Sequence, residues 1–465
     1  MPLKIGTPVH CVELNTGSNL TGTLSVSEQT MRVDIHSYDK FFLIRSELPV
    51  FLKTAEADTV SLHSNITGGT GHTSRLVDQK EQTYESIYHQ EIVSNIVLVG
   101  NTRWEEADKI KRVHFKVNHI DHLLRHRRKI EAISAARSPG GEHFLLFRDA
   151  AKGMKLSAWY AANYNTSLDS PQSVWPTFEI EFDVPVGLHD YVRHLSSYVS
   201  FLSLLVGVRL APREIHIDRL SFDEMKERVE THSYPGNHRV HYVWAEDEIT
   251  MGDTNGFGSP VRAYDDDALV SLRAVLISWM DRADEWRNPY QLMMGSFSFR
   301  HVVSPERLIN ACRWLEEIPK AKPQNSLQKE ELAAISAAAT EKAAELGHPE
   351  AIQKRIENAI GLIRLETSEE RFSRLVGTVK KSFGEQILPT NVVDHLTRAI
   401  RFRGKAAHGH FEPDDDTESQ AFYKSMRAME ALCLLLTVRD LPISEQGRDQ
   451  ISSHPLVEGY FRAYE

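Results

Sequence analysis

The sequence is poor in cysteine and has no long uninterrupted hydrophobic run. Its three cysteines, Cys11, Cys312 and Cys433, are far apart, and their odd number supports neither a disulfide framework nor a cysteine-based zinc site. The most apolar stretch, residues 198–210, is interrupted by serines and is shorter than the roughly 20 apolar residues of a membrane span. The first residues also lack the charged start and apolar run of a secretory signal. We therefore expect a soluble protein of a reducing, cytoplasmic compartment.

Basic side chains are not in excess either. The 465 residues include 64 acidic and 54 basic side chains, a formal charge of −10, which is the wrong sign for a protein that coats nucleic acid without specificity. Any contact with RNA or DNA must therefore be local. Hydrophobic residues make up 41% of the chain and no internal repeat is present, which excludes collagen-like and disordered classes. The length suits two or three domains of about 100 to 200 residues each.

Up to about residue 250 the hydrophobic residues alternate with polar ones, which is the period of a half-buried β-strand. In the clearest case, Phe178, Ile180 and Phe182 alternate with acidic residues, so one face is expected in a core and the other in water. Residues 31–35 and 113–117 follow the same pattern. Clusters of turn-forming residues at 15–19, 68–71 and 138–141 are predicted to separate the strands.

Residues 1–255 are therefore predicted to form a β-rich domain, an antiparallel sheet or sandwich with one packed helix. The helix is expected over residues 191–205, where Tyr191 and Leu195 begin an apolar stripe at helical spacing, and it should cover or plug the sheet. Residues 246–267 are acidic and rich in glycine, a composition typical of a linker or a long surface loop.

After this segment the period becomes helical, and residues 256–465 are predicted to form an all-α domain, a helical bundle. The predicted fold class is thus α+β, with the β-rich part first. Residues 328–346 combine alanine and charge with a thin apolar face, which predicts a projecting or exposed helix. The other expected helices carry apolar stripes over residues 269–286, 308–318 (after a start at Ser304-Pro305), 352–363, 372–383, 392–400 and 422–436 (after a cap at Asp416-Thr417).

The most informative local sequence is RFRGKAAHGH at residues 401–410. If the preceding helix continues, Arg403 falls on its apolar face. An unpaired guanidinium is costly to bury, so Arg403 should face a carboxylate, a phosphate or a groove between packed subunits. Residues 314–317 are expected to pack in the bundle with an exposed acidic edge, although a glutamate there could orient Arg403. Alternatively, the helix ends near Gly404 and the arginine extends into solvent at the helix terminus.

His408 follows Arg403 by five positions, which in an unbroken helix places the two side chains about 140° apart. Either a break at Gly404 or a dimer in which each subunit contributes one face to a cleft would bring them together. Such a pair suits cleavage of RNA without a metal ion. Neutral histidine can take the proton of a ribose 2′-hydroxyl, and Arg403 can hold the phosphoryl oxygens as charge develops, with Lys405 adding a point charge.

Residues 403–408 match the R-x4-H form of the R-x(4 to 6)-H motif of HEPN domains, which are small helical bundles that commonly dimerise and act as ribonucleases. The β-rich first half and the late motif resemble the ApeA-like HEPN proteins of bacterial antiphage defence. The resemblance implies that Arg403 and His408 of two protomers form a composite catalytic site without a cofactor. It also implies cleavage of RNA, such as tRNA, that halts translation in an infected cell (abortive infection). Because a toxic nuclease needs restraint, we expect residues 1–255 to sense or regulate, by binding a trigger such as a phage-encoded protein and releasing the nuclease.

Other interpretations remain open. The bundle could be a catalytically inactive HEPN module for dimerisation or RNA binding, with a ligand-sensing N-terminal domain, because many HEPN nucleases carry a polar residue where this chain has Gly404. His410 could serve as the base in place of His408. A metal-dependent hydrolase is a third interpretation, since these two histidines form an H-x-H pair, although no third ligand is identifiable.

Basic side chains on the helices around the motif could line an RNA groove, or they could form a solvated face with ion pairs to residues such as Glu366. Residues 125–129 form a denser basic run that could touch RNA or a partner, or be a solvated helix end. Residues 68–72 lack the Lys-Ser/Thr ending of a phosphate loop and predict a turn or hairpin. The basic residues near the motif are Arg364, Arg371, Arg374, Lys380, Lys381, Arg398, Arg401 and Lys405, and we expect Arg398, Arg401, Lys405 and His410 to contact RNA.

Overall fold

The computed structural model describes residues 8–13, 19–26, 31–37, 49–54, 58–78, 83–121, 123–135, 141–164, 171–242, 258–299, 302–325, 327–363, 365–407 and 415–464. The chain forms two compact units. Unit 1 comprises Met1–Val199, Leu210–Glu248 and Ala263–Leu269, and unit 2 comprises Ser200–Arg209, Ile249–Arg262 and Val270–Glu465. The chain therefore passes between the units more than once.

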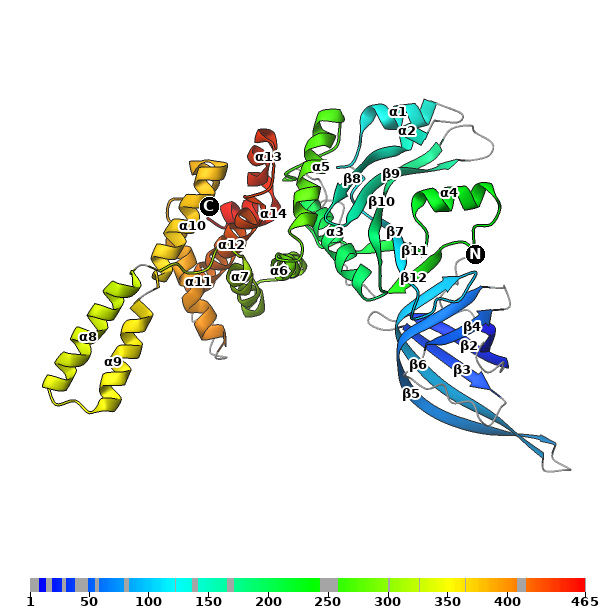
Figure 1. The fold of residues 1–465 in the computed structure, drawn as a ribbon, viewed down its shortest axis with the longest axis horizontal. Helices are drawn as coiled ribbons and strands as arrows, with labels where there is room; N and C mark the ends of the chain where they lie inside the picture. The colour runs from blue at the N-terminus through cyan, green and yellow to red at the C-terminus, as the bar shows by residue number, and fades with distance from the viewer. Residues whose placement is uncertain are drawn as a thin grey trace. The chain divides into compact units, whose positions relative to one another are not determined.

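Unit 1 is built around one sheet, which has twelve strands within the described residues (Figure 1). Every pair of neighbouring strands is antiparallel, in the order β3-β2-β1-β4-β5-β6-β12-β11-β7-β10-β9-β8. The strands are β1 (Pro8–Glu13), β2 (Asn19–Val26), β3 (Met31–Ser37), β4 (Val50–Thr54), β5 (Thr59–Asp78), β6 (Thr83–Gly100), β7 (Ile110–Val117), β8 (Leu145–Ala151), β9 (Met154–Tyr164), β10 (Pro171–Val186), β11 (Pro212–Asp218) and β12 (His238–Tyr242).

Strands β1 to β6 close into a ring, because β3 pairs with β6 as well as with β2. The turn predicted at residues 68–71 is wrong, since these residues lie inside β5. The register of β5 against β6 shifts between Thr67 and Thr70, so Gly68 and Gly69 lie at an irregularity of the ladder, where glycine is readily accommodated. The predicted turns at 15–19 and 138–141 fall largely outside the described residues.

Helix α3 (Asp190–Val206) covers one face of the second half of the sheet. The ring of Tyr198 lies 5.5 Å from that of Phe115 in β7 and 5.6 Å from that of Phe178 in β10. Ile180 and Phe182 are also buried on β10. The predicted helix over 191–205 and its place against the sheet are confirmed.

The opposite face of β10 is covered as well, by the segment that opens α4 (Phe222–Glu230). Glu179 and Glu181 are only 4% and 5% exposed. The backbone N–H of Phe222 donates to Glu181 Oε2 at 3.0 Å, and Arg112 Nη1 donates to Glu179 Oε2 at 3.4 Å. The expectation that this polar face lies in water is therefore wrong for Glu179 and Glu181, whereas Asp183 is exposed as expected. The two-residue period identifies a polar face but does not say what covers it.

Unit 2 is all-helical, so the predicted fold class, an antiparallel β-rich half followed by helices, is confirmed. Its central element is α12, whose residues from Ala428 to Val438 are all buried and which packs against α6, α7, α10, α11 and α14.

None of the helices in the described ranges combines the length and the apolar character needed to cross a membrane. The helices of the chain not yet given are α1 (Arg127–Ala135), α2 (Gly141–Phe144), α5 (Asp266–Asp281), α6 (Arg287–Ser298), α7 (Pro305–Glu317), α8 (Lys329–Glu345), α9 (Glu350–Ile363), α10 (Ser368–Phe383), α11 (Val392–Ala407), α12 (Asp416–Val438), α13 (Glu445–Gln450) and α14 (Pro455–Tyr464), with short 3₁₀ turns at Glu385–Ile387 and Ile451–Ser453.

A buried ion pair fixes α7 against α12. Arg307 Nε and Nη2 donate to the two carboxylate oxygens of Glu430 at 2.7 and 2.8 Å, and both side chains are fully buried. The remaining guanidinium nitrogen, Nη1, donates to the carbonyl oxygen of Val302 at 2.8 Å. Losing one partner of such a pair costs about 3 to 5 kcal/mol, because the other charge is left buried without compensation. The pair therefore fixes the register of the two helices.

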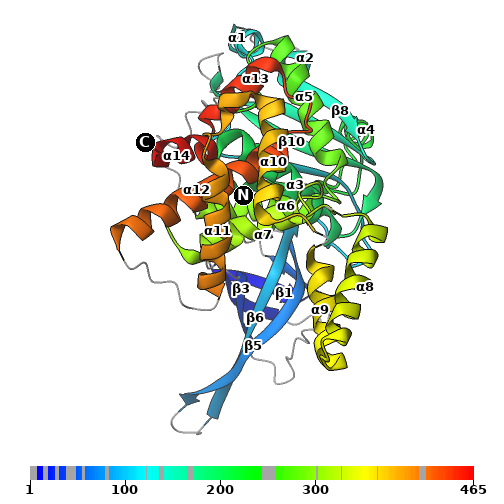
Figure 2. The same ribbon diagram turned by 90° about the vertical axis from the view of Figure 1, so that its left-hand side faces the viewer.

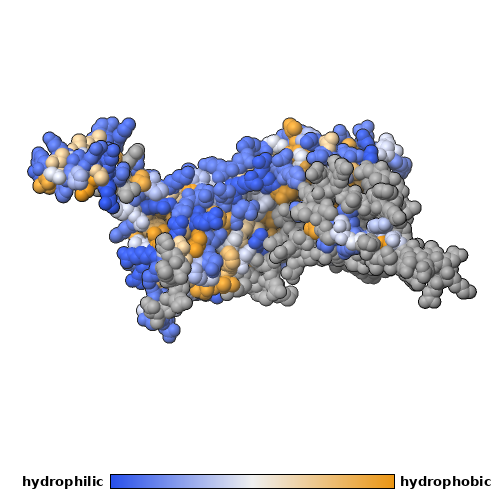
Figure 3. All heavy atoms as spheres, turned by 90° about the horizontal axis from the view of Figure 1, so that it is seen from below, coloured by the Kyte–Doolittle hydropathy of each residue, from blue (hydrophilic) through white to orange (hydrophobic). Residues whose placement is uncertain are grey.

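Helices α8 and α9 form an antiparallel hairpin that extends away from the other helices of unit 2 (Figures 1 and 2). In α8 only Ala343 is buried, so the exposed helix predicted over 328–346 is confirmed. The surface of the hairpin is mainly hydrophilic, with isolated apolar residues (Figure 3), among them the exposed Ile335, Leu346 and Ile352.

The described end of the predicted linker is packed. Residues 243–257 lie outside the described part of the chain, but Ser259 and Val261 are 1% and 4% exposed. Gly258 lies so close to His454 that a Cβ atom on it would be 2.1 Å from the His454 Cα. Residues 258–261 therefore belong to the core of unit 2 and are not a surface loop as expected.

Candidate functional site

Helix α11 positions the first of the predicted catalytic residues. Val392, Leu396 and Ala399 are fully buried and Phe402 is 7% exposed, so these residues form the face that holds the helix in the bundle. The helix does not end at Gly404, as one expectation had it, but continues to Ala407. Apart from its own helix, no described residue has an atom within 4 Å of a Cβ built on Gly404. A break at this glycine, one of the two predicted ways to join Arg403 and His408, is absent.

Arg403 is held by a carboxylate from a neighbouring helix. Its Nη1 and Nη2 donate to Oε1 and Oε2 of Glu316 in α7 at 2.5 and 3.3 Å. The predicted role of a glutamate from residues 314–317 in orienting Arg403 is thereby confirmed. The side chains of Arg403 and Glu316 are 34% and 45% exposed. Exposed ion pairs contribute about 0 to 1 kcal/mol, so this contact orients the guanidinium more than it stabilises the fold.

The paired guanidinium keeps donors for a second anion. Each terminal nitrogen of arginine carries two N–H groups, and Glu316 accepts from one N–H of each. A phosphate that approaches from the solvent side could use the remaining N–H groups or compete with Glu316. Arg403 is thus an oriented, solvent-accessible cation.

The space behind Arg403 contains thiols that do not act as nucleophiles. Burial raises the pKa of Cys312 to about 12, and burial also raises the pKa of Cys433 well above its ordinary value. Because only a thiolate is strongly nucleophilic, both side chains are inert near pH 7. Arg371 lies in the same region, where its Nε donates to the carbonyl oxygen of Ala321 at 2.8 Å. Burial lowers the pKa of Arg371, but a guanidinium stays charged at neutral pH.

The other basic residues of α11 fall into two classes. Lys405 Nζ donates to Glu418 Oε1 of α12 at 2.7 Å, so the predicted point charge for a phosphate is paired in this structure. Arg398 and Arg401 are exposed, and neither forms an ion pair with another described residue. These two guanidinium groups are therefore available to a ligand.

The predicted bases cannot be placed. His408 and His410 lie outside the described residues, and α11 ends at Ala407, the residue directly before His408 in the sequence. Arg403 thus lies four residues before the end of α11, and His408 is the next residue in the sequence after that end.

Several of the more distant basic residues form ion pairs. Arg374 makes a bidentate contact with Glu366, as the alternative of a solvated, paired face predicts, and Lys380 lies 3.7 Å from Glu385. Arg364 lies outside the described residues. The groove-lining role therefore stays a prediction mainly for Arg398 and Arg401.

A cluster of buried charges in unit 1 was missed by the sequence analysis. Arg112 of β7 lies between Glu179 and Asp218, whose Oδ2 it reaches at 3.1 Å. The hydroxyl of Tyr234 also donates to Asp218. Burial raises the pKa of Glu179, an effect that Arg112 and Arg148 partly offset. The only available signal was the alternation of charged residues on neighbouring strands, which does not reveal that they share a covered face.

The described residues contain no group of three or more His, Cys, Asp or Glu side chains that could hold a metal ion. Comparisons with protein-family models, curated proteins and solved structures find no match.

Proposed function

We propose that the protein is an endoribonuclease that works without a metal ion, in which Arg403 stabilises the reacting phosphate and His408 is the general base. The observation that carries the proposal is the presentation of Arg403. It stands at the surface on an unbroken helix, oriented by Glu316, four residues before the helix ends next to His408.

In the proposed reaction the ribose 2′-hydroxyl attacks the adjacent phosphate. His408 takes the hydroxyl proton, because neutral imidazole is the side chain best suited to that role near pH 7. The new bond between the 2′-oxygen and phosphorus forms as the bond to the 5′-oxygen of the next nucleotide breaks. The leaving oxygen takes a proton from water, and His408 later releases its proton to the solvent. Arg403 donates to the phosphoryl oxygens as negative charge develops on them. Arg398 and Arg401 contact flanking phosphates.

The continuity of α11 favours a site shared by two copies of the chain. Positions five apart in a helix point about 140° from each other, so Arg403 and a His408 that continued the helix would not converge on one atom. Because α11 is unbroken at Gly404, we propose the other arrangement, in which two subunits each contribute one face of the cleft.

The proposal is tested with purified protein and total RNA in the presence of EDTA. We expect Arg403→Ala and His408→Ala each to lower the cleavage rate roughly 100- to 10,000-fold, which is the range for removing a charge-stabilising donor or a general base. Arg355→Ala is the matched control, since Arg355 is exposed on α9 in the projecting hairpin.

Undiminished cleavage in both variants would remove the proposed site. Retention of RNA without cleavage by the wild-type protein would support the inactive RNA-binding module instead, and loss of cleavage on chelation would support a metal-dependent hydrolase. Glu316→Gln adds a finer test, because it keeps the shape of the orienting side chain but removes its charge.

The biological setting that we propose is defence of a bacterial cell, with cleavage of tRNA halting translation after unit 1 responds to a phage product. The support is the order of the two halves of the chain and the motif at residues 403–408. Cells that carry the wild-type protein should resist phage in a plaque assay, and cells that carry Arg403→Ala should not.

A further inference from the structure

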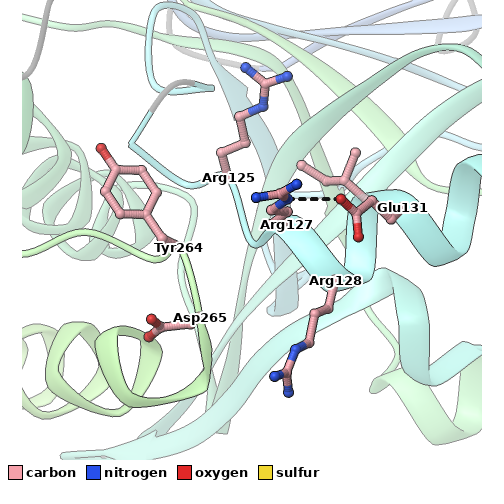
Figure 4. Close-up of a pocket in the computed structure, with 7 residues that line it drawn as sticks. Arg125, Arg127, Arg128, Glu131, Tyr264 and Asp265 are labelled. Atoms are coloured by element: carbon pink, nitrogen blue, oxygen red, sulfur yellow. Dashed lines mark hydrogen bonds and ion pairs between the residues drawn. The ribbon is translucent and has the colours of Figure 1, made fainter.

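Unit 1 contains a pocket that the proposed nuclease function does not use. Its volume is about 570 Å³, and it is lined by Arg125, Arg127, Arg128, Ile130, Glu131, Tyr264 and Asp265. This volume lies within the range of about 300 to 1,000 Å³ that is usual for small-molecule sites. Figure 4 shows Tyr264 and Asp265 on one wall, across from the arginines and Glu131 on the other. The arginines belong to the basic run at residues 125–129.

The two walls of the pocket are fastened to each other. The backbone N–H of Arg127 donates to the carbonyl oxygen of Tyr264, and that of Ala263 donates to the carbonyl oxygen of Leu123, at 3.1 and 3.0 Å. Between them His126 is buried, with its Nε2 3.0 Å from Asp266 Oδ1. The pocket is therefore formed before any ligand arrives, which reduces the entropy lost on binding.

The two carboxylates that line the pocket do not neutralise all of its arginines. Glu131 Oε1 accepts from Arg127 Nε at 2.9 Å, and Asp265 Oδ1 accepts from the backbone N–H of Ala268 at 2.9 Å, so both carboxylates of the lining are occupied. Within the described part of the chain, the ion pair of Arg128 is a long contact of 3.9 Å to Asp266. Arg125 is exposed and forms no ion pair with any described residue. Two guanidinium groups are thus available for an anion.

An aromatic ring completes the lining. Tyr264 is 44% exposed, although its backbone is fixed by Arg127. A flat aromatic surface opposite guanidinium groups fits a ligand that has both a planar ring and an anionic group. A nucleotide has both, since its base can stack on an aromatic side chain and its phosphate can accept charge-assisted hydrogen bonds from arginine.

We propose that this pocket binds a nucleotide, with the phosphate held by Arg125 and Arg128 and the base stacked on Tyr264. The nucleotide is either free or part of a single RNA strand. The inference concerns unit 1 and does not depend on the cleavage chemistry assigned to Arg403.

The test measures binding to the full chain carrying Arg403→Ala, so that RNA is not consumed. The probes are AMP, ATP, a 5′-phosphorylated uridine hexanucleotide, inorganic phosphate and a hexaglutamate peptide, each followed by calorimetric titration. Saturable binding of AMP or ATP identifies a free nucleotide, and binding of the hexanucleotide alone identifies an RNA strand. In either case Arg125→Gln and Arg128→Gln should each raise Kd about tenfold or more, as expected for loss of a charge-assisted contact.

Variants of the aromatic wall separate stacking from charge. Tyr264→Leu should raise Kd for the nucleotide by a similar factor, and Tyr264→Phe should bind as the parent does, because it keeps the ring. Arg228→Ala, an exposed arginine on α4, is the matched control and should have no effect.

The assignment is overturned if no nucleotide probe binds saturably, if the variants bind as the parent does, or if hexaglutamate or inorganic phosphate binds at least as tightly as every nucleotide. None of these outcomes depends on cleavage, so they are distinguishable from failure of the proposed nuclease.

Discussion

At the scale of single residues, His454 is a buried imidazole that must stay neutral. It is 1% exposed; its Nε2 lies 3.2 Å from the carbonyl oxygen of Leu204, and its Nδ1 accepts from the backbone N–H of Leu456 at 3.3 Å. Both ring nitrogens are satisfied by one neutral tautomer. Burial lowers the pKa of His454 to about 4, although the contact with Leu204 opposes the shift.

The free energy of unfolding should therefore depend on pH between about 6.5 and 4. In this range the unfolded chain binds a proton at His454 that the native protein does not bind, so stability is complete above about pH 6.5 and falls as the pH is lowered. The expected slope is roughly 1.4 kcal/mol per pH unit for this residue. Urea unfolding across this range should show a weaker dependence in His454→Gln than in the wild type. An equal pH dependence of the free energy of unfolding in the two proteins would contradict the lowered pKa of His454. His114 and His241, with pKa values lowered to about 4, add to the slope in both proteins.

At the scale of elements, two glycines illustrate opposite constraints. Gly404 lies within α11 with free space around it, whereas Gly258 is pressed against the backbone of residues 453 and 454. Gly404 lowers the stability of the helix because glycine loses more backbone entropy on folding than other residues do. Gly258 is required because the packing leaves no room for a Cβ atom.

We expect Gly404→Ala to raise the free energy of unfolding by about 0.5 to 1 kcal/mol, because alanine removes the entropy cost of glycine in a helix. Gly258→Ala is the contrasting control and should lower it by about 1 to 3 kcal/mol, because the added Cβ overlaps the backbone near His454. Chemical unfolding measures both. A destabilised Gly404→Ala protein would mean that α11 is strained at this position.

Some helices and strands could be predicted from the sequence, and others could not. The apolar stripes predicted α3, α11 and α12 because a helix that packs on one side repeats every three or four residues. Helix α4 was missed, although its capping box of Ser221 and Glu224 is a local signal. The glycines of β5 were mistaken for a turn because only the partner strand β6 shows that the chain stays extended.

At the scale of the whole molecule, we propose that two copies of the chain share the site. The sequence indicated that Arg403 should face an anionic group and that a glutamate of residues 314–317 could be that group, and the structure shows the contact with Glu316. It was not sufficient to find the pocket of unit 1, which joins residues 125–131 to Tyr264 and Asp265 across more than a hundred residues of chain. Such distant pairings depend on the completed fold rather than on local pattern.

Mixing two inactive proteins should restore cleavage. If one copy supplies Arg403 and the other His408, a dimer of Arg403→Ala with His408→Ala has one intact site and one site lacking both groups. Random reassortment of a twofold dimer should therefore recover about a quarter of the wild-type rate. The measurement is cleavage of RNA after refolding or co-expression of the two variants. Recovery no greater than the sum of the separate variants would place both groups in one subunit.

The ribbon formed by β5 and β6 extends past its neighbours. β4 pairs with β5 only as far as Leu62 and β3 pairs with β6 only from Tyr88, whereas β5 and β6 remain paired with each other as far as Asp78 and Thr83. In this outer part each strand has a single described partner, and isolated two-stranded ribbons are marginally stable in water. We therefore expect local unfolding of the sheet to begin in this outer ribbon and to stop where β3 and β4 pair with β6 and β5.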